Sequence, residues 1–167
     1  MKISAHYLDQ NKQLHAGTEA FGTSGHKWAH KANDLSRALK TQSVLDYGCG
    51  KGTMQDKIKF PISQYDPAVE EHSAEPEPHD IVMCTDVLEH IEPECLDAVL
   101  DDLRRLTKQV GFFVIATRLA IKTLPDGRNA HLIVEPVEWW VEKLEQRWSR
   151  VETRVPGPRE FQATVWV

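Results

Sequence analysis

The hydrophobic residues of this chain follow two periods that alternate along the sequence. Three segments repeat apolar residues every three or four positions, the spacing of an amphipathic helix. They are residues 26–40, 94–106 and 136–148. Between them lie short, almost continuous apolar runs, typical of strands buried on both faces of a parallel sheet. These are residues 43–47, 62–65, 79–84 and 110–117, followed by a last pair of strands at 150–154 and 161–167. The alternation predicts an open, doubly wound α/β sheet.

A glycine-rich turn follows the first predicted strand. Residues 46–52 read Asp-Tyr-Gly-Cys-Gly-Lys-Gly, and a short helix is expected at 53–58 before Pro61. Glycines let the backbone turn tightly and approach a ligand, and the helix that follows directs free N–H groups at it. Asp66 lies 20 residues beyond Asp46, at the end of the next strand, where a carboxylate can accept hydrogen bonds from ribose hydroxyls. Together these features predict a cofactor of the adenosine type.

The glycine spacing argues against a nicotinamide dinucleotide. The dinucleotide fingerprint requires Gly-x-Gly-x-x-Gly, but counting from Gly48 the sixth position is Thr53 and the third glycine, Gly52, falls one residue early. The segment 67–79 contains three prolines and is too short for a full helix and strand. A nicotinamide-dependent oxidoreductase is therefore disfavoured.

Two sequence segments carry a family resemblance. VLDYGCGKG resembles motif I of the class I S-adenosylmethionine-dependent methyltransferases, and HDIVMCTDVLEHIEPE resembles the fourth-strand motif of their small ubiquinone-biosynthesis-type members. The resemblance covers about residues 44–155. It implies S-adenosylmethionine as cofactor and a Rossmann-like sheet with an antiparallel last strand. Because 67–79 is so short, the third strand of that sheet is expected to be missing. Residues 44–167 would form the methyltransferase domain and residues 1–43 an amino-terminal cap and lid helix.

The resemblance also implies the cofactor-binding residues. The backbone of Gly48, Cys49, Gly50 and Gly52 would lie along the methionine part, with Asp46 at its amino group. Asp66 would hold the ribose, while Tyr65 and Pro67 would take over adenine recognition from the missing segment. Thr85 and Asp86 would lie beneath the sulfonium, where a carboxylate favours the charged cofactor over the neutral product. The alternative for Asp86 is capping of the turn into the next helix.

Acceptor-side residues are expected after the fourth- and fifth-strand motifs. His90 is either a proton acceptor near the methyl group or a histidine packed under the following helix and bonded to a backbone carbonyl. His131, in the polar loop after the strand 110–117, is the first candidate for a general base, with Arg128 as an anion clamp. The alternative is an ordinary Asp-Gly turn in solvent. Trp139 lies off the apolar face of its helix and is a candidate acceptor wall, and residues 21–25 form a possible lid turn.

Composition limits the remaining classes. Cys49, Cys84 and Cys95 offer neither a disulfide framework nor a zinc spacing, which suits a cytoplasmic protein. His26 and His30 have no third ligand in view, so no metal is expected. No segment has the length and apolarity of a membrane span or a signal peptide.

Charge is distributed unevenly within the net value of −5. Residues 60–102 contain thirteen acidic residues and no Lys or Arg, whereas the segments on either side are basic. No continuous basic stripe is present to neutralise phosphates, which argues against duplex nucleic acid. An anionic small molecule touching the basic ends stays open, as does the alternative that the acidic block is a solvated face.

The sequence thus predicts an enzyme that transfers a methyl group from S-adenosylmethionine to an oxygen or nitrogen of a small molecule. The alternative is a protein that binds the cofactor without transferring the methyl group, such as a sensor or a degenerate partner subunit. The sequence identifies neither the acceptor nor the oligomeric state.

Overall fold

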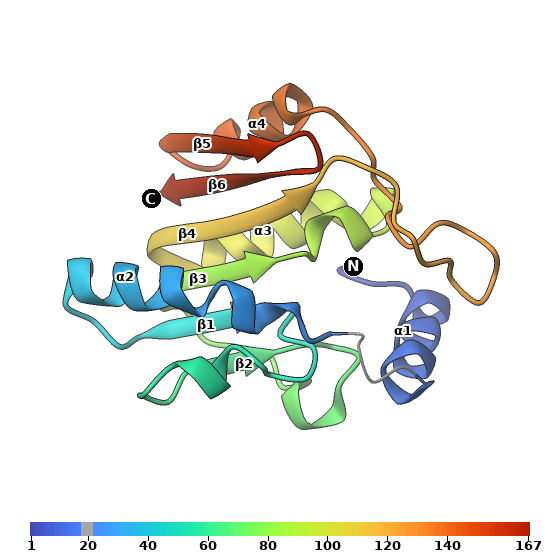
Figure 1. Ribbon diagram of the computed structural model, residues 1–167, viewed down its shortest axis with the longest axis horizontal. Coiled ribbons are helices and arrows are strands. Elements are labelled where there is room, and N and C mark those ends of the chain that lie inside the picture. Colours follow the sequence, from blue (N-terminus) through green and yellow to red (C-terminus); the bar gives the residue numbers. More distant parts are fainter. Residues whose placement is uncertain (18–21) are drawn as a thin grey trace.

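The computed structural model describes residues 1–17 and 22–167, and their strands form one six-stranded sheet in the order β2-β1-β3-β4-β6-β5 (Figure 1). The first four strands in chain order are parallel, and β6 pairs antiparallel with both β4 and β5. The strands are β1 (Val44–Tyr47), β2 (Ser63–Tyr65), β3 (His79–Thr85), β4 (Thr107–Ala116), β5 (Arg150–Gly157) and β6 (Glu160–Trp166). The predicted doubly wound sheet with one antiparallel strand is confirmed.

Helices cover both faces of the sheet. α2 (Ala29–Leu39) lies on one face, and α3 (Leu96–Leu106) and α4 (Val137–Glu145) lie on the other (Figure 1). Alternate residues of β4 supply the two cores: Phe112 packs in the cluster of α2, whereas Phe113 packs in the cluster that holds α3 and α4. This two-sided burial explains why the strands read as continuous apolar runs.

The expected loss of a third strand is also confirmed. β1 pairs directly with β2, and the described chain between β2 and β3 contains only a short 3₁₀ helix, Glu70–His72. The expected helix at 53–58 is shorter than predicted, a 3₁₀ turn over Gln55–Lys57. The Gln55 side chain replaces the missing helical bonds, since its amide donates to the carbonyls of Ile58 and Phe60 and accepts from the N–H of Ile62.

The structure adds a helix that the hydrophobic pattern did not predict. α1 (Ala5–Gly17) lies beyond the carboxyl ends of the strands (Figure 1). It contains few apolar residues, so its sequence has no apolar stripe from which a helix could be predicted. Side chains elsewhere hold it in place: Glu92 accepts hydrogen bonds from both the N–H and the hydroxyl of Ser4, and the Tyr7 hydroxyl donates to the carbonyl of His90 at 2.6 Å.

No helix in the described ranges combines the length and apolarity needed to span a membrane. All three cysteines are free and buried.

Candidate functional site

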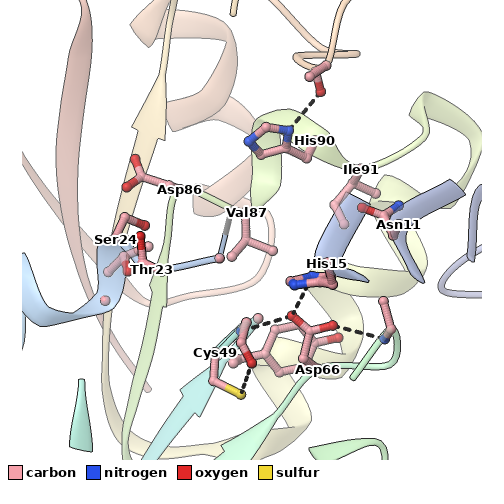
Figure 2. A pocket seen from close by; sticks show the side chains of 18 of the residues that line it. Asn11, His15, Thr23, Ser24, Cys49, Asp66, Asp86, Val87, His90 and Ile91 are labelled. Atoms are coloured by element: carbon pink, nitrogen blue, oxygen red, sulfur yellow. Dashed lines mark hydrogen bonds and ion pairs between the residues drawn. The ribbon is translucent and has the colours of Figure 1, made fainter. Parts of the chain in front are cut away.

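A cavity of about 390 Å³ lies at the carboxyl ends of the parallel strands. Its walls come from the glycine-rich turn, the ends of β2 and β3, α1, and the loop after β4. In Figure 2, Cys49 and Asp66 lie at one end and His90 lies at the other, with Asp86 and Val87 between them. Most of the residues predicted to bind a cofactor line this cavity: Asp46, Gly48, Cys49, Gly50, Tyr65, Asp66, Pro67, Thr85 and Asp86.

The glycine turn is shaped by close contacts. Gly48 and Gly50 both have positive φ, 75° and 53°. A Cβ on Gly48 would lie 2.4 Å from a methyl carbon of Val87, and one on Gly50 would lie 2.5 Å from the carbonyl oxygen of Gly22. Both positions therefore require glycine. Gly52 lies outside the cavity lining and packs against the Gln64 side chain, so its role is to shape the turn.

Asp66 is the fixed carboxylate of the cavity. It follows β2 directly and accepts hydrogen bonds from the backbone N–H groups of Gly50 at 3.0 Å and Ala68 at 2.9 Å. The Nε2 atom of His15, from α1, lies 4.0 Å from the same carboxylate. Burial lowers the pKa of His15, and the negative charge of Asp66 opposes that shift. The carboxylate thus ties the glycine turn, the strand end and the covering helix together.

Asp46 is the unsatisfied carboxylate of the cavity. It stands at the third position of β1, and its Oδ2 atom is buried without a hydrogen-bond partner in the described chain. Burial, together with the charge of Asp66, raises the pKa of Asp46 to about 7. A buried carboxylate oxygen without a donor is costly, so this atom is suited to a positively charged ligand group that donates hydrogen bonds.

Two histidines form the other end of the cavity. The rings of His90 and His131 meet edge to face with centroids 4.7 Å apart. The Nδ1 atom of His90 lies 2.7 Å from the carbonyl oxygen of Ala130, and that of His131 lies 2.6 Å from the carbonyl oxygen of Arg118. The pKa of His90 is lowered to about 4, mainly by burial and secondly by the neighbouring His131. Burial also lowers the pKa of His131. His90 therefore makes the hydrogen bond to a backbone carbonyl that was expected of a packed, structural histidine. It also lines the cavity.

The structure does not bring Arg128 or Trp139 to the cavity. Arg128 forms an ion pair with Asp126 at 2.8 Å, and its guanidinium lies 5.9 Å from the ring centroid of Tyr7, so it braces the loop against α1. Trp139 packs edge to face on Trp140 and lines a separate cavity of about 170 Å³. Arg118 and Lys122 line the main cavity in the place that the sequence reading gave to Arg128.

Sequence reasoning also missed a polar stripe on α1. Tyr7, Asn11 and His15 are spaced four residues apart and all line the cavity. Tyr7 contacts the histidine end through the carbonyl of His90, and His15 contacts Asp66 at the other end. The four-residue spacing is visible in the sequence, but a search for apolar periodicity passes over polar residues. Of the turn 21–25, Phe21 lies outside the described residues, and Gly22, Thr23, Ser24 and Gly25 line the cavity.

Comparisons with known proteins agree with this geometry. A family model described as a methyltransferase domain matches residues 20–154. Among solved structures, 1,6-didemethyltoxoflavin-N1-methyltransferase from Burkholderia thailandensis, with S-adenosylhomocysteine bound, has a TM-score of 0.64 and 15% identity, over 96% of this chain and 88% of its own. The N-methyltransferase NodS from Bradyrhizobium japonicum, also with S-adenosylhomocysteine, has a TM-score of 0.59 and 13% identity, over 96% of each chain.

At such identities these structures show the fold alone. No curated protein matches the chain significantly in sequence. The family match spans most of the chain and includes both strand-end motifs. The chain therefore belongs to the methyltransferase-domain family of the class I S-adenosylmethionine-dependent methyltransferases.

Proposed function

We propose that this protein transfers a methyl group from S-adenosylmethionine to an oxygen or nitrogen atom of a small molecule. The observation that carries the proposal is the division of one cavity into two chemically different ends. One end offers a glycine cradle and two acidic side chains, and the other offers two histidines with engaged Nδ1 atoms.

The residues at the first end fit the cofactor. A Cβ at Gly48 or Gly50 would collide with Val87 or Gly22, so the two glycines keep the turn in the shape that lines the cavity. The unpaired Oδ2 atom of Asp46 suits an ammonium group. Asp66 accepts two backbone hydrogen bonds, and a carboxylate has about four acceptor sites, so it can also accept from ribose hydroxyls. When bound, the cofactor supplies an electrophilic methyl group on a sulfonium.

Thr85 and Asp86 lie between the two ends. Asp86 follows β3 with φ of 58°, an uncommon conformation for a residue other than glycine. Such backbone is often found where a side chain is held for function. Asp86 lines the cavity, as expected of a carboxylate placed near a sulfonium.

The acceptor would enter at the histidine end. An oxygen acceptor would transfer its proton to His131 while its oxygen bonds to the methyl carbon, and the departing sulfur would keep the electron pair of the broken bond. Holding the reactants in line would supply much of the rate. Arg118 and Lys122 in the wall support an anionic acceptor. A structural neighbour that is a 1,6-didemethyltoxoflavin-N1-methyltransferase is consistent with a small-molecule acceptor.

We further propose that residues 1–43 act as cap and lid on a domain formed by residues 44–167. The support is the polar stripe of α1, which runs from the histidine end to Asp66. The three free, buried cysteines support a reducing compartment such as the cytoplasm.

Two measurements test the proposed function. Calorimetry should show binding of S-adenosylmethionine and S-adenosylhomocysteine and none of NAD. Small molecules with hydroxyl or amine groups should then be screened, with anionic ones included, for production of S-adenosylhomocysteine. Turnover of one class of small molecules would support the proposal. A reaction without acceptor is the control. Tight cofactor binding without turnover across the screen would favour a binding protein instead.

A further inference from the structure

Three potential metal ligands converge behind the histidine end of the cavity. Glu89 and His90 belong to a short 3₁₀ helix (Leu88–His90) after β3, and His131 belongs to the loop after β4. One ligand atom from each side chain lies within 4.8 Å of the other two. Glu89 is fully buried, and the two histidines are partly buried. No metal site was predicted from the sequence, because these residues meet only when the loop after β4 folds back onto β3.

Both histidines are held in the tautomer that metal binding needs. Each Nδ1 atom lies within 2.7 Å of a backbone carbonyl oxygen, which can only accept a hydrogen bond. Nδ1 therefore carries the proton in the neutral ring, and the lone pair is on Nε2. A second hydrogen bond of this kind commonly orients a metal-bound histidine and raises its basicity.

Glu89 brings a buried carboxylate with one unused oxygen. Its Oε1 atom accepts a hydrogen bond from the N–H of Ala116 at 3.1 Å. Its Oε2 atom is buried and has no hydrogen-bond partner in the described chain. Burial, together with the charge of Asp86, raises the pKa of Glu89 to about 8. A buried carboxylate oxygen without a partner, in a side chain that lies close to two histidines, is suited to a cation that compensates for it.

We propose that Glu89, His90 and His131 bind a divalent transition-metal ion through Oε2 and the two Nε2 atoms. Two imidazoles and one carboxylate suit Mn²⁺, Fe²⁺ or Zn²⁺ better than Mg²⁺ or Ca²⁺, which prefer oxygen ligands. With metal–ligand bonds of about 2.1 Å, neighbouring ligand atoms lie about 3 Å apart, so small side-chain rotations would close the site. His90 and His131 face the cavity, which leaves the remaining coordination positions to water or the acceptor.

This site deepens the proposed function and rests on it for its chemical role. A cation here would contact the acceptor and lower the pKa of a hydroxyl bound to it. The acceptor would then be an oxygen nucleophile whose proton passes to water as its oxygen receives the methyl group. His131 would hold the cation in place of accepting the proton itself.

The test is direct binding of Mn²⁺ to the full chain after treatment with a chelator, without acceptor. Electron paramagnetic resonance of free Mn²⁺ counts the bound ions, and Zn²⁺ should displace them. We expect one Mn²⁺ for each chain and at least tenfold weaker binding in His131→Ala and Glu89→Gln. His30→Ala is the matched control, because His30 is exposed and its Nδ1 bonds the carbonyl of Lys27 in the same way.

The outcomes separate the two proposals. Binding of S-adenosylhomocysteine, measured in every variant, reports whether the cofactor end is folded. Mn²⁺ binding that is equal in wild type and in a folded His131→Ala protein overturns the metal site while leaving the proposed function intact. Metal binding that depends on His131, without any binding of S-adenosylhomocysteine, overturns the proposed function and leaves the metal site standing. If Glu89→Gln does not fold, the half-buried His131 still provides a decisive variant.

Discussion

At the residue scale, the two carboxylates at the cofactor end differ in how they are satisfied. Asp66 accepts two backbone hydrogen bonds, whereas Asp46 keeps a buried oxygen without a partner. The first is therefore part of the folded scaffold, and the second is the one that we propose binds the ligand. A buried polar atom without a partner lowers the stability of the unliganded protein but is available to bind a ligand.

The raised pKa of Asp46 predicts opposite effects of pH on stability and on binding. Its pKa is about 7 in the fold against 3.8 ordinarily, so the native state holds more protons between these values. The free energy of unfolding of the unliganded protein should therefore fall as pH rises from about 4 to 7. An ammonium ligand requires the ionised carboxylate, so affinity for S-adenosylhomocysteine should rise from pH 6 to 8. Asp46→Asn should weaken binding at pH 8 and flatten both profiles, as followed by calorimetry and denaturant unfolding. The same slopes in the Asn variant would contradict this role.

Removal of the other carboxylate should weaken binding of the cofactor. Asp66→Ala removes the acceptor for ribose hydroxyls, a loss of about 1–3 kcal/mol of cofactor binding free energy. It also frees the N–H groups of Gly50 and Ala68, so circular dichroism should verify the fold. Asp34→Ala on the exposed face of α2 is the control. Unchanged affinity in a folded Asp66→Ala protein would place the ribose elsewhere.

His131 provides the matching prediction for the acceptor end. Because it lies at the far end of the cavity from Asp66, His131→Ala should keep affinity for S-adenosylhomocysteine within about twofold. Turnover with the identified acceptor should fall by about 10²-fold or more, the effect of losing a residue that acts on the reacting group. Arg128→Ala, outside the cavity lining, is the contrasting variant and should leave turnover near wild type. Full activity in His131→Ala would show that this histidine belongs to an ordinary loop and does not act on the acceptor.

At the element scale, α1 is the part of the site that depends most on its neighbours. Its contacts are polar bonds at its start, at Tyr7 and at His15, together with a small apolar cluster in which Tyr7 and Leu14 pack with Leu124 and Ala130. A helix of 13 residues with so little apolar surface is marginal by itself. It should therefore open more readily than α2, whose Ala29 and Ala32 are buried in a core cluster.

Hydrogen exchange can test this difference. In the free protein the amides of α1 should exchange faster than those of α2. Binding of S-adenosylhomocysteine beneath α1 should slow its exchange at least tenfold while changing α2 little. His15→Ala should reduce that protection, since it removes the contact with Asp66. Equal protection of α1 with and without ligand would show that it is a fixed cover.

At the scale of the whole molecule, the uneven charge along the chain is balanced by folding. The acidic segment 60–102 meets basic residues from both ends of the sequence. Lys2 pairs with Glu75 and Asp102, while Arg147 pairs with Asp97 and Asp101. Partly exposed pairs of this kind contribute little individually, but they place the basic termini around the acidic block.

Ligand binding should be visible in the stability of the whole chain. At a concentration one hundred times its Kd, S-adenosylhomocysteine should add about 2.7 kcal/mol to the free energy of unfolding. For a chain of this size that corresponds to a rise in Tm of roughly 5–10 °C. NAD at the same concentration should leave Tm unchanged, because the glycine turn lacks the dinucleotide spacing. A rise with NAD and none with S-adenosylhomocysteine would overturn the proposed function.

The order of the strands followed from local sequence, as did the residues at the end of the cavity that we propose binds the cofactor. Continuous apolar runs identified the buried strands, and the glycine turn with Asp46 and Asp66 identified the carboxyl ends of β1 and β2. Such features lie within a few residues or one strand crossover, so the pattern of the chain suffices to predict them. The absence of the third strand could be predicted from the shortness of segment 67–79 alone.

The histidine end of the cavity, which we propose receives the acceptor, was decided by tertiary structure. Whether Arg118 or Arg128 enters the cavity depends on how the loop after β4 folds back, and Arg128 pairs with Asp126 instead. α1 has no apolar stripe and is placed by bonds to Glu92 and His90, which lie more than eighty residues away. The contact of Glu89 and His90 with His131 spans about forty residues. Local propensity carries no information on such distances, because closing these contacts depends on the packed sheet that brings the loops together.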